Sequence, residues 1–176
     1  MKDIHSRPGI GDCLSCSHHF HFAPEDCVRH QEVSLRLAGA LLRSGGDRES
    51  ARVVQDCEIA FDHGANVRPG IILVRKNRIG IIGKRKLHGA PDLAVEIACE
   101  CSAPEVLRIK KRIYSELKVQ ELWIVYPRSE TVTVLAWSEI GYVVIGRYGR
   151  SDRIRSLLLH GSRIALRGIF PGGLYP

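Results

Sequence analysis

The pattern of apolar and polar positions divides the chain into three regions. Residues 1–29 are rich in Gly, Pro, Cys and His, and they show neither a helical nor a strand period. Residues 30–126 alternate between helix-like and strand-like patterns, and residues 130–176 have the Gly and Pro turns typical of β-structure. We therefore predict an irregular Cys/His-rich extension over residues 1–29 and one folded domain over residues 30–176.

Within this domain, two segments have the 3.6-residue period of a helix that packs on a core. The first covers residues 30–43 and ends at a Ser-Gly-Gly sequence. The second covers residues 104–117 and begins with Pro104, which suits a first helical turn. Strand patterns are predicted over residues 51–61, 67–74, 92–99, 120–126, 131–137 and 142–148, the last two forming a hairpin. This order predicts an α/β or α+β fold with helices packed on a sheet.

Composition and charge narrow the possible classes of protein. The 44% hydrophobic content excludes general disorder, and the apolar runs are strand-sized, which excludes a transmembrane helix. The first residues lack the apolar stretch of a signal peptide, so we expect a cytoplasmic protein whose six cysteines are reduced or metal-bound. The formal net charge of +7 favours a polyanionic partner such as DNA.

A basic segment over residues 75–89 surrounds the apolar sequence IGIIG. Two interpretations are open for it. It is either a solvated loop or a basic ribbon that lies against a phosphate backbone.

One acidic residue occupies a position where a buried strand normally has an apolar one. In the sequence DLAVEIAC, Glu96 lies between Ala94 and Ala98 on one face of the strand. A buried carboxylate is costly unless it is paired or binds a cation. Glu96 is therefore either half of an ion pair or a ligand of a metal ion.

The helix that follows this strand offers a partner. At 100° per residue, Lys110 falls within the apolar stripe of that helix, whereas Arg108, Lys111 and Arg112 fall outside it. We therefore predict that Glu96 and Lys110 approach one another at one edge of the sheet. A carboxylate and a lysine that converge there can hold a divalent metal and stabilise a phosphoryl transition state.

These residues belong to a longer stretch, residues 90–127, that resembles the putative restriction endonuclease family of the PD-(D/E)XK nuclease superfamily. The family's motifs match Pro91-Asp92-Leu93 with Glu96, Lys110 with Tyr114, and Glu121-Leu122-Trp123-Ile124-Val125. The resemblance implies a restriction-endonuclease-like core, with a mixed sheet flanked by helices and a C-terminal hairpin.

The resemblance also implies an activity, which is magnesium-assisted hydrolysis of DNA phosphodiester bonds in a bacterial protein. It makes Glu96, Lys110 and Asp92 the candidate catalytic residues and Glu96 the candidate ligand of Mg²⁺. DNA is then the expected partner, and assembly as a homodimer is an open alternative to a monomer.

The sequence departs from the family pattern at the metal site. Gly70 stands where the family has a metal-binding aspartate, and Tyr126 replaces a second aspartate of the family. Asp92 does not compensate, because four residues along a strand separate it from Glu96 by roughly 13 Å. Two hypotheses follow: an endonuclease with impaired activity, or an inactive nuclease-fold module that binds DNA or another protein.

A third hypothesis, a zinc-dependent nucleic-acid-binding protein, rests on the N-terminal region. Cys13-x-x-Cys16 and Cys27-x-x-His30 are separated by ten residues and could bind zinc tetrahedrally. His30 has another explanation, because it also matches a histidine at the start of the family's first helix. The alternative is an extension that binds no metal.

Overall fold

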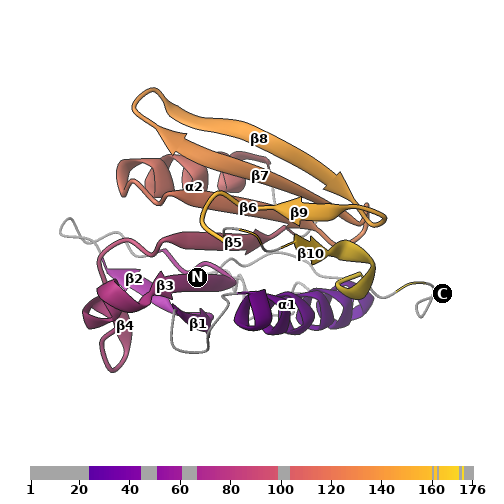
Figure 1. The fold of residues 1–176 in the computed structure, drawn as a ribbon, viewed down its shortest axis with the longest axis horizontal. Helices are drawn as coiled ribbons and strands as arrows, with labels where there is room; N and C mark the ends of the chain where they lie inside the picture. Colours follow the sequence, from indigo (N-terminus) through magenta and orange to yellow (C-terminus); the bar gives the residue numbers. More distant parts are fainter. Residues whose placement is uncertain are drawn as a thin grey trace, which may run out of the picture.

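The computed structural model of the protein describes residues 24–44, 51–60, 67–98, 104–159, 161, 163–170 and 172. A six-stranded mixed sheet forms its centre, and one long helix lies against each face (Figure 1). The mixed sheet flanked by helices confirms the predicted fold class. Neither described helix is long and apolar enough to cross a membrane.

The strands of the main sheet are, in spatial order, β1 (Ala51–Gln55), β3 (Ile71–Arg75), β5 (Leu93–Ile97), β6 (Glu121–Tyr126), β7 (Thr131–Ser138) and β8 (Gly141–Gly149). Strands β5 and β6 are parallel, and every other neighbouring pair is antiparallel. A parallel pair needs a crossover connection, and the helix α2 (Pro104–Glu116) supplies it. The carboxyl end of β5 therefore leads directly to the amino end of α2.

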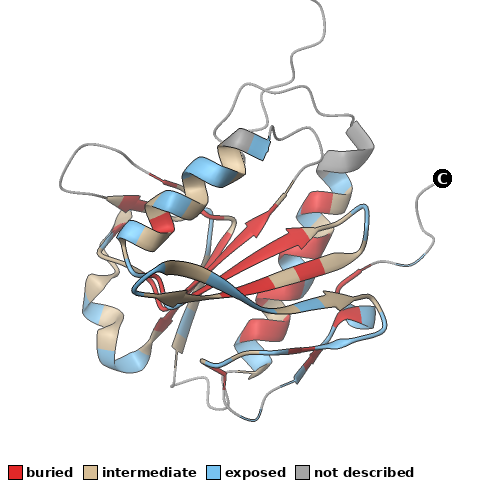
Figure 2. Ribbon diagram, turned by 90° about the horizontal axis from the view of Figure 1, so that it is seen from above, coloured by how far each residue is buried: buried red, intermediate tan, exposed pale blue. Residues whose placement is uncertain are grey.

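The two faces of the sheet bury separate clusters of apolar side chains. The helix α1 (Pro24–Ser44) packs Val33, Leu37 and Leu41 against odd-numbered residues of β5 such as Val95. On the other face, even-numbered residues such as Ala94 lie in the cluster that contains Tyr114 of α2. Figure 2 shows the buried central strands between the two helices. Strand alternation therefore turns Glu96 towards the side of α2.

The C-terminal part confirms the predicted hairpin and adds a smaller sheet. Strands β7 and β8 form the hairpin, and β9 (Arg153–Arg155) pairs with β10 (Arg163–Ala165). A short 3-10 helix, η2 (Leu166–Gly168), follows β10. Its Leu166 and the following Phe170 are buried in the cluster under α1, so this end of the chain closes the core.

The first helix begins earlier than predicted. It starts at Pro24 rather than at residue 30, so residues 24–29 are helical and do not belong to an irregular extension. Proline suits this start because the first turn of a helix does not need its backbone N–H. The remainder of the predicted extension, residues 1–23, lies outside the described residues.

The predicted strand over residues 51–61 was wrong as one element. It divides into β1 and β2 (Glu58–Ala60), which belong to different sheets. Asp56 lies between them with a φ of 51°, a left-handed conformation that ends an extended strand. The short β2 then pairs with β4 (Lys86–His88).

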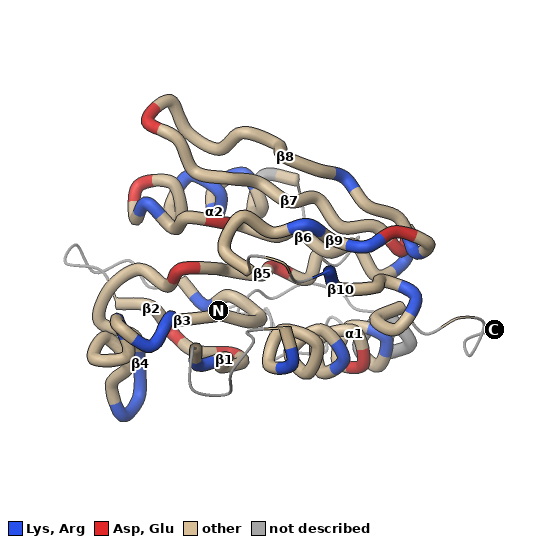
Figure 3. The backbone as a smooth tube through the Cα atoms, viewed as in Figure 1, with Lys and Arg blue, Asp and Glu red and all other residues tan. Residues whose placement is uncertain are grey.

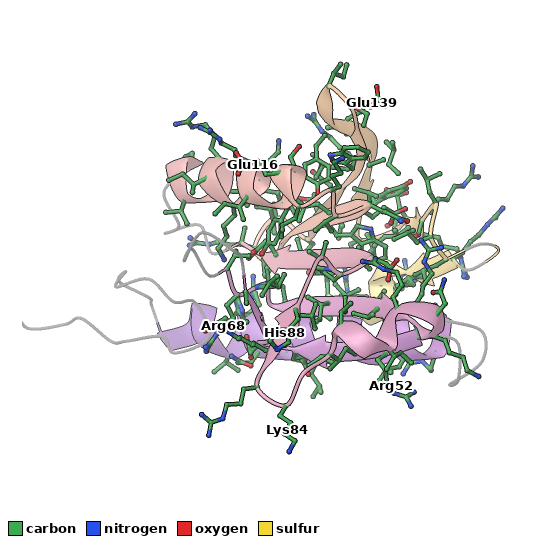
Figure 4. All side chains as sticks on the ribbon, turned by 90° about the vertical axis from the view of Figure 1, so that its left-hand side faces the viewer. Arg52, Arg68, Lys84, His88, Glu116 and Glu139 are labelled. Atoms are coloured by element: carbon green, nitrogen blue, oxygen red, sulfur yellow. The ribbon has the colours of Figure 1, made fainter. Side chains whose placement is uncertain are left out.

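The basic segment has more secondary structure than either interpretation of it assumed. It contains a 3-10 helix, η1 (Lys76–Ile81), and then β4. Lys84 in the loop before β4 points away from the body of the protein (Figure 4). Lysine and arginine positions are therefore frequent along the backbone of this folded segment (Figure 3).

Candidate active site at the end of strand β5

Glu96 lies near the carboxyl end of β5, in a strand whose residues are all buried. Its own exposure is only 6%. The alanine at position 94 leaves space beside it on the same face, so the carboxylate can face α2 without a clash. The fold thus places a single acidic group at the point where β5, α2 and the start of β3 meet.

Two side chains of α2 bind this carboxylate. The ammonium of Lys110 donates a hydrogen bond to Oε2 of Glu96 at 2.9 Å, and the hydroxyl of Tyr114 donates one to Oε1. Lys110 and Tyr114 are four residues apart, so they lie on one face of the helix. The predicted approach of Glu96 and Lys110 is confirmed. Sequence reasoning matched Tyr114 to the family but gave it no role, although this spacing from Lys110 indicated one.

Tyr114 is fully buried and acts as a neutral donor. Burial, and then the negative charge of Glu96, raises the pKa of the Tyr114 hydroxyl well above its usual value. The proton therefore stays on the phenol oxygen over the whole range in which proteins function. Glu96 is held by one charged donor and one neutral donor.

His30 of α1 belongs to the same neighbourhood. Its side chain is buried, and its Nδ1 has no hydrogen-bond partner among the described residues. Burial, and then the positive charge of Lys110, lowers the pKa of the imidazole. His30 is therefore neutral at pH 7, and the positive charge of Lys110 on α2 adds to the effect of burial.

The proposed zinc ligands cannot be compared in the same way. Cys13, Cys16 and the side chain of Cys27 lie outside the described residues. Only His30 can be placed, and its described charged neighbour is Lys110. The zinc site stays a prediction.

Gly70 lies directly before β3, near the end of β5 that carries Glu96. Ile71, the residue after Gly70, pairs with Val95, the residue before Glu96, and this is the last pair of the antiparallel ladder. A Cβ at residue 70 would lie 3.5 Å from the carbonyl oxygen of Val95 and 3.8 Å from Cγ1 of Ile97, which are ordinary contact distances. Residue 70 therefore has room for a side chain, which would begin beside Ile97.

Asp92 has a different environment at the opposite end of β5. Its buried carboxylate accepts hydrogen bonds from the backbone N–H of Arg75 at 2.9 Å, from Nε of Arg75 at 3.0 Å and from Nη1 of Arg78 at 3.0 Å. These bonds fix the start of η1 to the sheet. The structure does not bring Asp92 together with Glu96 and Lys110, and its contacts are those of a residue that stabilises the fold.

Glu121, another residue of the matched motif, is also occupied by structural contacts. Its carboxylate accepts hydrogen bonds from Nε1 of Trp123 and from Oγ of Ser156, each at 2.9 Å, and from the backbone N–H of Leu157 and Leu158. It connects β6 to the segment that follows β9. The sequence could not indicate the contact with this segment, because Ser156 is 35 residues away in the chain.

The residues of the site do not fit a magnesium ion in this arrangement. Mg²⁺ prefers several oxygen ligands in octahedral geometry, often from more than one carboxylate. Among the described residues, Glu96 is the only carboxylate with an ion pair to Lys110, and both of its oxygens already accept hydrogen bonds. Within the described ranges, no group of three acidic, Cys or His residues could hold a metal ion.

Comparisons with known proteins agree with this architecture. One solved structure, described as a putative nuclease from Anabaena variabilis ATCC 29413, superposes with a TM-score of 0.65. It is 14% identical in sequence, and the match covers 81% of this chain and 80% of that one, so it supports the fold. A search of curated proteins found no match. Residues 20–167 match the family Uma2, described as putative restriction endonuclease. The chain therefore belongs to this family of nuclease-fold proteins.

Proposed function

We propose that this protein binds DNA and that its magnesium-dependent hydrolysis of phosphodiester bonds is weak or absent, because Gly70 supplies no carboxylate. The observation that carries the proposal is the state of Glu96. Lys110 and Tyr114 bind its two oxygens, while residue 70, directly before the Ile71–Val95 pair at this end of the ladder, is a glycine.

The charge of the site explains why a metal would bind weakly. Glu96 carries one negative charge and Lys110 one positive charge, so the pair is neutral as a whole. A divalent cation would have to compete with the ammonium for the same carboxylate. An aspartate at residue 70 would add a ligand and a second negative charge, which is what the family pattern has at this position.

DNA binding is supported by the distribution of positive charge. The segment from η1 to β4 carries exposed cations such as Lys84 and Arg85, and α2 carries Arg108 and Arg112 on its outer side (Figures 3 and 4). Phosphate contacts of this kind do not depend on base sequence, and they weaken as the salt concentration rises. We expect binding that tolerates different sequences and falls steeply with salt.

An interaction with a protein is the second candidate function, and the edge strand β8 favours it. Val143, Val144 and Ile145 of β8 are 48%, 45% and 38% exposed, and Ile140 in the preceding turn is 95% exposed. The strand ends the sheet and leaves main-chain groups unpaired on its outer side. A homodimer that pairs two β8 edges is one such assembly.

Two measurements test the proposal together. Calorimetry with Mg²⁺ and Mn²⁺ on the wild-type chain should show no strong metal binding, and fluorescence anisotropy with labelled DNA at low salt should show binding. Absence of DNA binding at low salt would favour the protein-interaction function. Light scattering of the same sample would then give the assembly state.

A further inference from the structure

A hollow of about 400 Å³ lies on the outer side of α2, next to β8. It is separate from the Glu96 site, because Leu107, Lys111 and Ser115 line it and lie four residues apart along a different face of the helix from Lys110. The described residues that line it are Pro104, Leu107, Arg108, Lys111, Arg112, Ser115 and Tyr142.

One part of this lining is strongly positive. Arg108, Lys111 and Arg112 contribute three cations, and none of the described residues that line the hollow is acidic. Arg112 donates a hydrogen bond to Glu116 at 2.9 Å, but this pair is exposed to solvent and therefore weak. The hollow is suited to an anion that carries more than one hydrogen-bond acceptor, such as a phosphate.

The other part is apolar and firmly held. Pro104 and Leu107 line it from α2, and the aromatic ring of Tyr142 lines it from β8. The hydroxyl of Tyr142 donates a hydrogen bond to the backbone oxygen of Val119 at 2.8 Å, which fixes the ring. A fixed aromatic ring beside cations is the combination on which bases of unpaired nucleic acid stack.

We propose that this hollow binds one unpaired nucleotide of a DNA strand. Arg108 and Lys111 bind its phosphate, and Tyr142 and Leu107 contact its base or sugar. A base that is stacked and paired inside a duplex cannot enter a concave site, whereas an unpaired base can. The inference rests on the proposed DNA binding, and it adds a preference for single strands or strand ends.

The hollow and the Glu96 site share α2. Lys110 faces Glu96 and the next residue, Lys111, lines the hollow. A DNA strand that binds at Lys111 therefore contacts the same helix that carries Lys110 of the candidate active site. This arrangement would present the junction between paired and unpaired DNA to that end of the sheet.

The test compares three labelled DNA probes in anisotropy titrations: a single strand, a blunt duplex of the same length, and that duplex with a single-stranded overhang. We expect Lys111→Ala to weaken binding of the single strand and the overhang by roughly 5- to 10-fold, and that of the blunt duplex less than about 2-fold. Arg108→Ala serves as a second variant. Lys84→Ala, which removes the same charge from the loop before β4, is the matched control and should weaken all three probes alike.

Equal weakening of all probes by Lys111→Ala would overturn the nucleotide site. A second arm separates the nucleotide from a simple anion, by titrating deoxyadenosine monophosphate and inorganic phosphate separately. Tighter binding of the nucleotide, lost in Lys111→Ala, supports the site; equal binding of both overturns it. A wild-type chain that binds the mononucleotide but none of the DNA probes would instead contradict the proposed DNA binding. Thermal unfolding of each variant checks that it is folded.

Discussion

The ammonium of Lys110 lies 2.9 Å from Oε2 of Glu96, so the helix that follows β5 returns a cation to the carboxylate at the end of that strand. The two side chains are 13% and 8% exposed, and the pair is therefore largely shielded from solvent. A shielded pair of this kind is sensitive to the loss of either partner, because the remaining charge is left without compensation.

Removal of the lysine should destabilise the protein. We expect Lys110→Met to lower the free energy of unfolding by roughly 3 kcal/mol, since Glu96 would stay buried without its charged donor. Urea unfolding measures the effect, and Lys111→Met on the adjoining face is the control. The double variant Glu96→Gln/Lys110→Met should recover part of the loss, and a strictly additive loss would contradict the coupling.

The hydroxyl of Tyr114 should contribute through its hydrogen bond alone. Tyr114→Phe keeps the ring in the apolar cluster but removes the donor to Oε1 of Glu96. We expect a loss of about 1–3 kcal/mol in the free energy of unfolding, because a buried acceptor loses a partner. Tyr142→Phe removes a hydroxyl whose acceptor is a backbone oxygen. We expect its loss in the free energy of unfolding to be smaller than that of Tyr114→Phe. An unchanged stability in Tyr114→Phe would show that water replaces the phenol.

Stability should fall in mild acid because of His30. Its pKa is lowered in the folded state by burial and by Lys110, so the unfolded chain binds the proton more readily. The stability that neutral His30 gives to the folded state is complete when the pH is above the pKa of the imidazole in the unfolded chain, which is about 6.5. This stability is lost as the pH falls below that value. Unfolding measured from pH 8 to pH 5 should show this loss in the wild type and a smaller loss in His30→Leu. If the free energy of unfolding fell equally with pH in both proteins, groups other than His30 would be the cause of the loss.

Zinc in the N-terminal region stays a prediction with a simple test. If Cys13, Cys16, Cys27 and His30 bind the metal, protein purified without chelator should contain close to one equivalent of zinc. Elemental analysis that finds less than about a tenth of an equivalent would reject the site. The lowered pKa of His30 would then be explained by burial and by the charge of Lys110, without a metal ion.

Local patterns predicted the central contact correctly. The alternation of DLAVEIAC placed Glu96 on one face of a buried strand, and the helical phase turned Lys110 towards it. Both inferences depend only on periods of two and 3.6 residues, which hold wherever a strand or helix is regular. The family motif matched Tyr114, but its hydrogen bond to Glu96 was not predicted.

Other features depend on contacts that are distant in sequence. Asp92 was a candidate for catalysis, yet Arg75 at the end of β3 and Arg78 of η1 bind it, and no local pattern indicates where η1 packs. The break at Asp56 depends on a single residue in a left-handed conformation, which apolar periodicity does not report. The effect of the Lys110 charge on the pKa of His30 depends on the relative positions of two helices that lie on opposite faces of the sheet.

The most direct test of the account is Mg²⁺-dependent nicking of supercoiled plasmid by the wild type and by variants at residue 70. The φ of Gly70 lies outside the left-handed region and the neighbouring atoms leave room, so the side chains of Gly70→Asp and the uncharged control Gly70→Asn can be accommodated. We predict little or no nicking by the wild type and by Gly70→Asn, and an increase of roughly 10-fold or more in Gly70→Asp. The increase should vanish when Glu96→Ala is added. Robust nicking by the wild type, unchanged in Gly70→Asp, would contradict the account and show that other residues hold the metal.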